Sequence, residues 1–116
     1  MKKILLTLVV LLSGCSIILP IKHDPVMFGD LVEVKIAVDK LTCEPKDPIA
    51  WDDATTKIHK LAVYSNLRGD PQATSINQLQ EAIGKAKDSK SKMLCEGVLK
   101  INRTRIDVVA DAWKGR

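Results

Sequence analysis

The chain has 116 residues, of which 46% are hydrophobic and 28% charged, and its formal net charge is +4. This length suits one small domain. The mixed charge and the small number of aromatic residues give no case for nucleic-acid binding, which uses clustered Lys and Arg with stacking aromatics. They also disfavour a β-sandwich, which would contain more aromatic and turn residues.

The first fifteen residues predict export. Lys2 and Lys3 precede an apolar run over residues 4–12 that only Thr7 interrupts. This run is too short to span a bilayer, which takes about 20 residues, and it is typical of a signal peptide. The protein is therefore expected to leave the cytoplasm.

The leader ends in Leu12-Ser13-Gly14-Cys15, which resembles the lipobox of bacterial lipoproteins. The resemblance implies that residues 1–14 are removed and that lipid on Cys15 anchors the protein to a membrane. Several acyl chains together hold a protein firmly. An ordinary secretory signal followed by a chance cysteine is the alternative.

The residues after Cys15 indicate where the anchored protein lies. Ser16 stands where an Asp would resemble an inner-membrane retention signal, so we expect the periplasmic face of the outer membrane. Residues 15–23 then form a short tether, with eight residues after Cys15 that reach at most about 28 Å.

Residues 24–116 are expected to form one helical domain. Without Lys2 and Lys3, the mature chain carries sixteen basic and fourteen acidic residues, a net charge of +2. Asp-Pro occurs at residues 24–25, 47–48 and 70–71. Asp is a strong N-cap and Pro is favoured at the first helical position, so each pair predicts the start of a helix.

The first segment, from Pro25 to about Thr42, fits two structures. Leu31, Val34, Val38 and Leu41 make a helical stripe, whereas residues 32–39 also alternate in the manner of a strand. A lone strand would have no partner in this chain and would leave an open edge. Helix is therefore favoured.

Three further segments have helical periodicity: Pro48 to Arg68, Pro71 to about Lys87, and Ser91 to Trp113. Their expected buried faces are, in turn, Trp51, Ala54, Ile58, Leu61, Ala62 and Ser65; Ile76, Leu79, Ile83 and Ala86; and Cys95, Val98, Leu99, Asn102, Ile106, Val109 and Trp113. Four helices with short links predict an all-α, up-down-up-down four-helix bundle.

With Cys15 used for lipid, Cys43 and Cys95 remain. In an oxidising periplasm we expect them to form one disulfide, worth about 4 kcal/mol on the chain-entropy model. Both cysteines would lie at one end of an up-down bundle, which agrees with this pairing. Free thiols or bridges between two chains are the alternatives. No metal site is expected, because neither cysteine has a second Cys or His at ligand spacing.

No catalytic or cofactor motif is present in the sequence, so the protein is not expected to be an enzyme. His59 follows Asp52, Asp53 and Thr55 by one or two turns, which could form an acid/base cluster. A solvated helix face with a polar contact four residues away is favoured instead. Four lysines near the third connection could contact anionic lipid or an acidic partner, although a solvated loop is the simpler interpretation; they are Lys85, Lys87, Lys90 and Lys92.

A small, lipid-anchored helical domain without an active site favours a non-enzymatic interaction module that meets another envelope protein. In its general plan the chain is similar to the outer-membrane spanin lipoproteins of bacteriophages, but it lacks their proline-rich pattern. A receptor-blocking, superinfection-excluding lipoprotein and a structural envelope-assembly lipoprotein fit the same features. The short tether favours partners in or beside the outer membrane. The sequence does not determine the oligomeric state.

Overall fold

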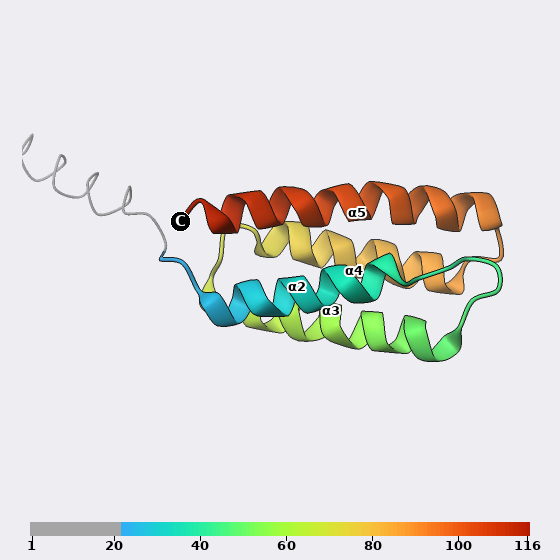
Figure 1. Cartoon of the computed structure of the whole chain (residues 1–116), viewed down its shortest axis with the longest axis horizontal. Coiled ribbons are helices and arrows are strands. Elements are labelled where there is room, and N and C mark those ends of the chain that lie inside the picture. Colours follow the sequence, from blue (N-terminus) through green and yellow to red (C-terminus); the bar gives the residue numbers. More distant parts are fainter. Residues whose placement is uncertain (1–21) are drawn as a thin grey trace, which may run out of the picture.

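The structure, a computed structural model, describes residues 22–116 and contains four helices in this range (Figure 1). They are α2 (Pro25–Asp39), α3 (Pro48–Arg68), α4 (Ala73–Asp88) and α5 (Lys92–Lys114). Consecutive helices pack against one another and α5 packs back against α2, so that α2 lies diagonally from α4 and α3 from α5. This confirms the four-helix up-down bundle, and it shows that residues 32–39 are helical. The predicted signal peptide, Cys15 and most of the tether lie outside the described residues.

The helix ends follow the capping residues. Asp24 accepts hydrogen bonds from the backbone N–H groups of Val26 and Met27, and Asp47 accepts one from Ile49. Each acceptor satisfies a donor that the first helical turn leaves unpaired. α3 ends at Gly69, whose φ of 69° is the left-handed conformation that glycine adopts without steric cost.

Two predicted boundaries were wrong. α4 begins at Ala73 and not at Pro71, because Pro71 and Gln72 form a turn that precedes the helix. The Asp70 side chain accepts from the backbone N–H of Gln72 and has further partners on α5 and at the C-terminus. α2 ends at Asp39 and not near Thr42. Leu41 is nevertheless buried beyond the helix end, as its place in the predicted stripe required.

The predicted faces form the core. Every residue of the four stripes is buried except Val98, which is partly buried and packs against the cluster. Trp51 and Trp113 are each 1% exposed, which confirms that both are core residues. Burial of a large apolar side chain stabilises a fold by about 1.5–3 kcal/mol, so these stripes supply the main driving force for folding.

The disulfide lies at the end of the bundle that holds the α2–α3 and α4–α5 connections; we call this the loop end. Cys43 and Cys95 are bonded, with their Cα atoms 6.0 Å apart. Trp51 donates its indole N–H to the carbonyl oxygen of Thr42. The Lys46 ammonium donates to the carbonyl oxygens of Ala86, Lys87 and Ser89, where α4 ends. The connection between α2 and α3 is therefore fixed to both α4 and α5.

Candidate interaction surface

The residues expected near His59 do not form an acid/base cluster. The Nδ1 atom of His59 lies 2.7 Å from the side-chain amide of Gln80 on α4. Asp52 forms an ion pair with Lys87, and Asp53 pairs with Lys57 one turn later. His59 is exposed on its helix, as the favoured interpretation required. The expected polar contact between His59 and Thr55 was wrong, because the Thr55 hydroxyl donates to backbone carbonyls of its own helix.

Residues 22–116 contain no group of three or more His, Cys, Asp or Glu side chains placed to hold a metal ion. In the same part of the chain, no helix combines the length and apolar character needed to span a membrane.

The predicted lysine patch is largely neutralised. Lys85 pairs with Glu81 at 3.1 Å, Lys87 with Asp52 at 2.6 Å and Lys92 with Glu44 at 3.8 Å. Acidic neighbours reduce the potential that would attract an anionic lipid. The patch is therefore a surface of mixed charge.

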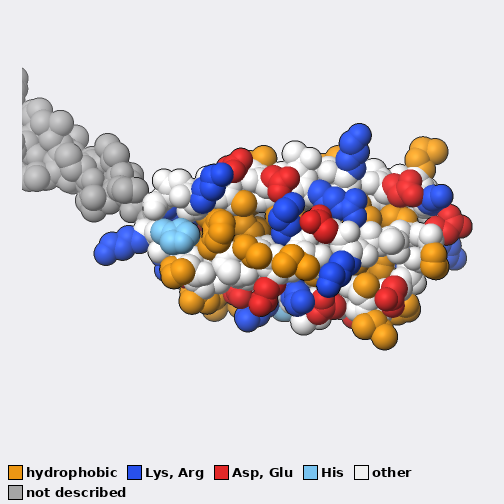
Figure 2. Space-filling view, in the orientation of Figure 1, with side chains coloured by type: hydrophobic (Ala, Val, Ile, Leu, Met, Phe, Trp, Pro, Cys, Tyr) orange, Lys and Arg blue, Asp and Glu red, His pale blue; other side chains and the backbone are white. Residues whose placement is uncertain are grey.

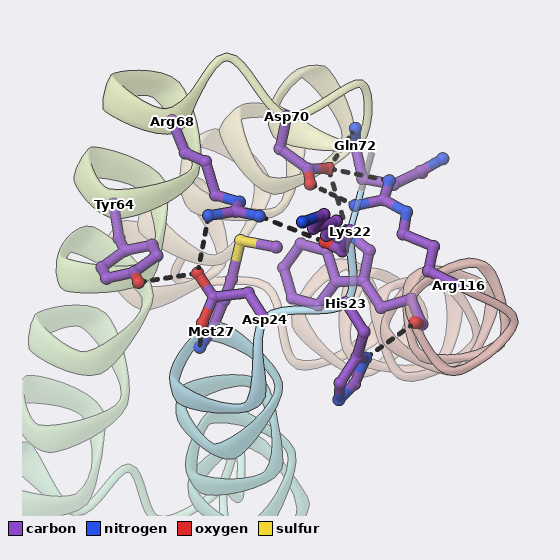
Figure 3. A network of polar contacts seen from close by, with 10 residues as sticks. Lys22, His23, Asp24, Met27, Tyr64, Arg68, Asp70, Gln72 and Arg116 are labelled. Carbon is purple, nitrogen blue, oxygen red and sulfur yellow. Dashed lines mark hydrogen bonds and ion pairs between the residues drawn. The ribbon is translucent and has the colours of Figure 1, made fainter. Parts of the chain in front are cut away.

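A polar network lies at the other end of the bundle, where the chain enters α2 (Figure 3). The Tyr64 hydroxyl donates to Oδ2 of Asp24 at 2.7 Å, and the Arg68 guanidinium lies 3.2 Å from the same oxygen. Asp24 is thus both the N-cap of α2 and the point where α3 is joined to it. The hydrogen bond from Tyr64, the backbone N–H of Met27 and the positive charge of Arg68 lower the pKa of Asp24 below its usual value.

Asp70 is the second centre of this network. Its side chain is completely buried and accepts from the indole N–H of Trp113 at 3.0 Å, and Arg116 forms a bidentate ion pair with it. Burial alone would raise the pKa of Asp70. The hydrogen bonds from Arg116, the backbone N–H of Gln72 and Trp113 outweigh that effect, so the pKa is lowered.

The same network holds the last residues before α2. The Arg68 guanidinium donates to the carbonyl oxygen of Lys22 at 3.1 Å. His23 donates from Nδ1 to the carbonyl oxygen of Trp113 at 3.2 Å, since a carbonyl can only accept. Residues 22–24 are therefore attached to α3 and α5, and the chain leaves the bundle from a fixed position beside the end of α5.

An apolar stripe runs along the side of α5 that faces away from the core. Leu94, Ile101 and Val108 are 57%, 63% and 59% exposed. They are spaced seven residues apart, and the small residues Gly97 and Thr104 lie one turn after the first two. This is the a/d spacing of a coiled-coil seam. We call Leu94, Gly97, Ile101, Thr104 and Val108 the α5 stripe.

The α5 stripe contains a hollow at its glycine. A shallow, open depression of about 360 Å³ lies above Gly97 and is lined by Ser91, Met93, Leu94, Gly97, Val98 and Ile101. A Cβ atom placed on Gly97 would meet nothing within 4 Å. The stripe therefore offers a depression bounded by apolar side chains.

A smaller apolar face lies on α2, where Val32 and Ile36 are 44% and 51% exposed. Figure 2 shows hydrophobic side chains gathered over α2 and along its boundary with α5, with charged groups between them. Lys35 bridges the two helices by pairing with Asp107 at 2.9 Å. The outer surface formed by α2 and α5 thus carries apolar side chains between its charged groups.

The core face of α5 was predicted correctly, whereas its outer apolar face was not predicted. The signal was present, because the seven-residue spacing of Leu94, Ile101 and Val108 can be read directly from the sequence. The buried stripe is enough to explain the amphipathic pattern of α5, so the pattern gave no reason to look for a second apolar stripe on the same helix.

No protein-family model, no curated protein and no solved structure matches this chain. Its function is therefore inferred from its own residues.

Proposed function

We propose that the protein is a lipid-anchored, non-enzymatic interaction module of the bacterial cell envelope, held by Cys15 at the periplasmic face of the outer membrane. The main support for an interaction role is the α5 stripe, whose three large side chains are all more than half exposed. Contiguous exposed apolar surface on a small domain marks an interaction site more often than an isolated apolar residue does.

The anchoring part rests on the sequence Leu12-Ser13-Gly14-Cys15. The polar network adds support, because it fixes residues 22–24 against the end of the bundle. A domain attached in this way is presented to its partner by a short connection with a defined starting point.

The anchor is tested by the variant Cys15→Ser in cells that export and process lipoproteins. We expect the wild-type protein in the membrane fraction and the variant in the periplasmic fraction. The double variant Cys43→Ala, Cys95→Ala is the control, since it removes two cysteines and keeps the lipobox. Tight membrane binding by Cys15→Ser would contradict the anchor.

The interaction part is tested in intact envelopes with a photo-crosslinking amino acid at position 101. We expect a crosslinked protein band that is absent when the same group replaces Lys57, which lies on α3 across the bundle from α5. Equal crosslinking from both positions, or none from either, would contradict the use of the α5 stripe.

A further inference from the structure

The α5 stripe has a pattern of size and charge that is complementary to itself. In an antiparallel pair of α5 helices, a and d positions of one copy face d and a positions of the other. If Ile101 of one copy faces Thr104 of a second copy, Val108 of that second copy faces Gly97. Ile101 and Val108 then each meet a smaller residue, whereas Leu94 faces Asp111 of the other copy.

The hollow at Gly97 matches this arrangement in shape. Leu94, Gly97, Val98 and Ile101 are spaced i, i+3, i+4 and i+7, which is the four-residue hole that receives one side chain in knobs-into-holes packing. Val108 of a second copy would occupy part of it. Two such contacts form at once, because the pair has a twofold axis.

Charge selects the direction of pairing. In the antiparallel register, Lys100 of each copy faces Asp107 of the other, which makes two attractive contacts. In a parallel pair, Lys100 would face Arg105 of the second copy, and Asp111 would face its own equivalent. Both of these contacts are repulsive, so the antiparallel arrangement is favoured.

Asp107 remains able to take part. It is 60% exposed, and its ion pair with Lys35 uses Oδ1 only. Its second carboxylate oxygen can accept from Lys100 of another copy. A carboxylate has about four acceptor sites in total.

We propose that the protein forms a homodimer in which the α5 stripes of two copies pack antiparallel, with Val108 of each copy seated over Gly97 of the other and Lys100 opposite Asp107. This names a second copy of the chain as a partner, and it rests on the proposed function in using the same surface. One helix per copy is a small interface, so the dimer is expected to form at protein concentrations of roughly tens to hundreds of micromolar.

The pairing has a consequence for the anchor. α2 begins and α5 ends at the same end of each bundle, so an antiparallel pair carries its two tethers at opposite ends (Figure 1). Two copies anchored through Cys15 then reach one membrane only with the long axis of the pair lying along its surface.

The register is tested by sedimentation of the full chain in mild detergent across that concentration range. Lys100→Asp and Asp107→Lys each place like charges opposite one another in a homodimer, and each is expected to weaken dimerisation about tenfold. An equimolar mixture of the two variants restores both attractive contacts, so we expect it to form a mixed dimer at the wild-type concentration. Lys57→Asp on α3 is the control with the same charge change and is expected to dimerise like the wild type.

A second variant separates association from folding. Gly97→Gln fills the hollow with a better helix former, so it is expected to raise the melting temperature of the monomer while abolishing the dimer. A monomeric wild type throughout the range, dimerisation of Lys100→Asp at wild-type strength, or no rescue in the mixture would overturn the proposal.

These results are distinguishable from failure of the proposed function. A monomeric chain whose position 101 still crosslinks to a different envelope protein refutes the dimer and leaves the interaction module in place. Membrane binding by Cys15→Ser refutes the anchor whatever the oligomeric state.

Discussion

The hydroxyl of Tyr64 donates a hydrogen bond to Oδ2 of Asp24, forty residues earlier in the chain, at 2.7 Å. Asp24 uses its other carboxylate oxygen to cap α2. One side chain therefore both starts a helix and joins it to its neighbour, at the point where the connection to the predicted anchor begins.

Tyr64→Phe should lower the melting temperature of the bundle by about 5 °C, because it removes one hydrogen bond to a charged, largely buried acceptor and keeps the ring. A double-mutant cycle with Asp24→Asn, followed by thermal unfolding, isolates the interaction from the separate capping role. If the effects of the two substitutions simply add, the bond contributes nothing measurable and the prediction is wrong.

Stability should fall in acid because Asp24 and Asp70 have lowered pKa values in the folded state. An unfolded aspartate has a pKa of 3.8, and protons bind more readily to the unfolded chain than to these two carboxylates. Their contribution is therefore complete well above pH 3.8 and is lost as the pH falls below this value, through the folded pKa values. We expect a level melting temperature from pH 7 to about 5 and a decline below about 4.

Asp70→Asn should already be less stable at neutral pH, by about 3 kcal/mol, because it leaves the Arg116 charge without its buried partner. Its melting temperature should also decline less steeply in acid than that of the wild type. Asp53→Asn is the control, since the carboxylate of Asp53 is 51% exposed in its ion pair. Parallel acid profiles for wild type and Asp70→Asn would refute the assignment.

Asp24 and Asp70 show which features of the structure could be predicted from the sequence and which could not. Asp24 and Asp70 have the same local sequence, Asp-Pro, and both were predicted to cap helices. Asp24 does so. Asp70 also accepts from the backbone N–H of Gln72, but its other partners are Trp113 and Arg116, 43 and 46 residues away. No local pattern identifies a contact at that separation, so the role of Asp70 at the C-terminus could not be predicted.

The core residues could be predicted because their burial follows from a local pattern in the sequence. A helix in a bundle buries one side, so the residues that share this side recur every three or four positions in the sequence. The burial of Ile58 and Ile106 could therefore be predicted without knowing which residues they contact. Tyr64 and Arg68 carried no such signal, because their role depends on the side chain that α2 brings beside them.

The disulfide should supply about 4 kcal/mol of stability, because it closes a loop with a sequence separation of 52. Cys43→Ala with Cys95→Ala should lower the free energy of unfolding by this amount in urea titrations. The oxidised wild type should also migrate as a faster monomer on a non-reducing gel. A dimer band that disappears with reductant would show instead that the cysteines pair between chains.

Lys46→Met should destabilise the loop end of the bundle by about 2 kcal/mol. The Lys46 ammonium donates to three carbonyl oxygens at the end of α4 and lies 5.5 Å from the centre of the Trp51 ring. Methionine keeps the apolar stem over Trp51 and removes the donor, so the loss measures the capping of α4 and not the packing. Lys90→Met, in the exposed loop that follows α4, is the matched control and should leave the urea midpoint unchanged. Equal midpoints for the two variants would mean that water replaces the ammonium at no cost, and that the α2–α3 connection is held by the disulfide and Trp51 alone.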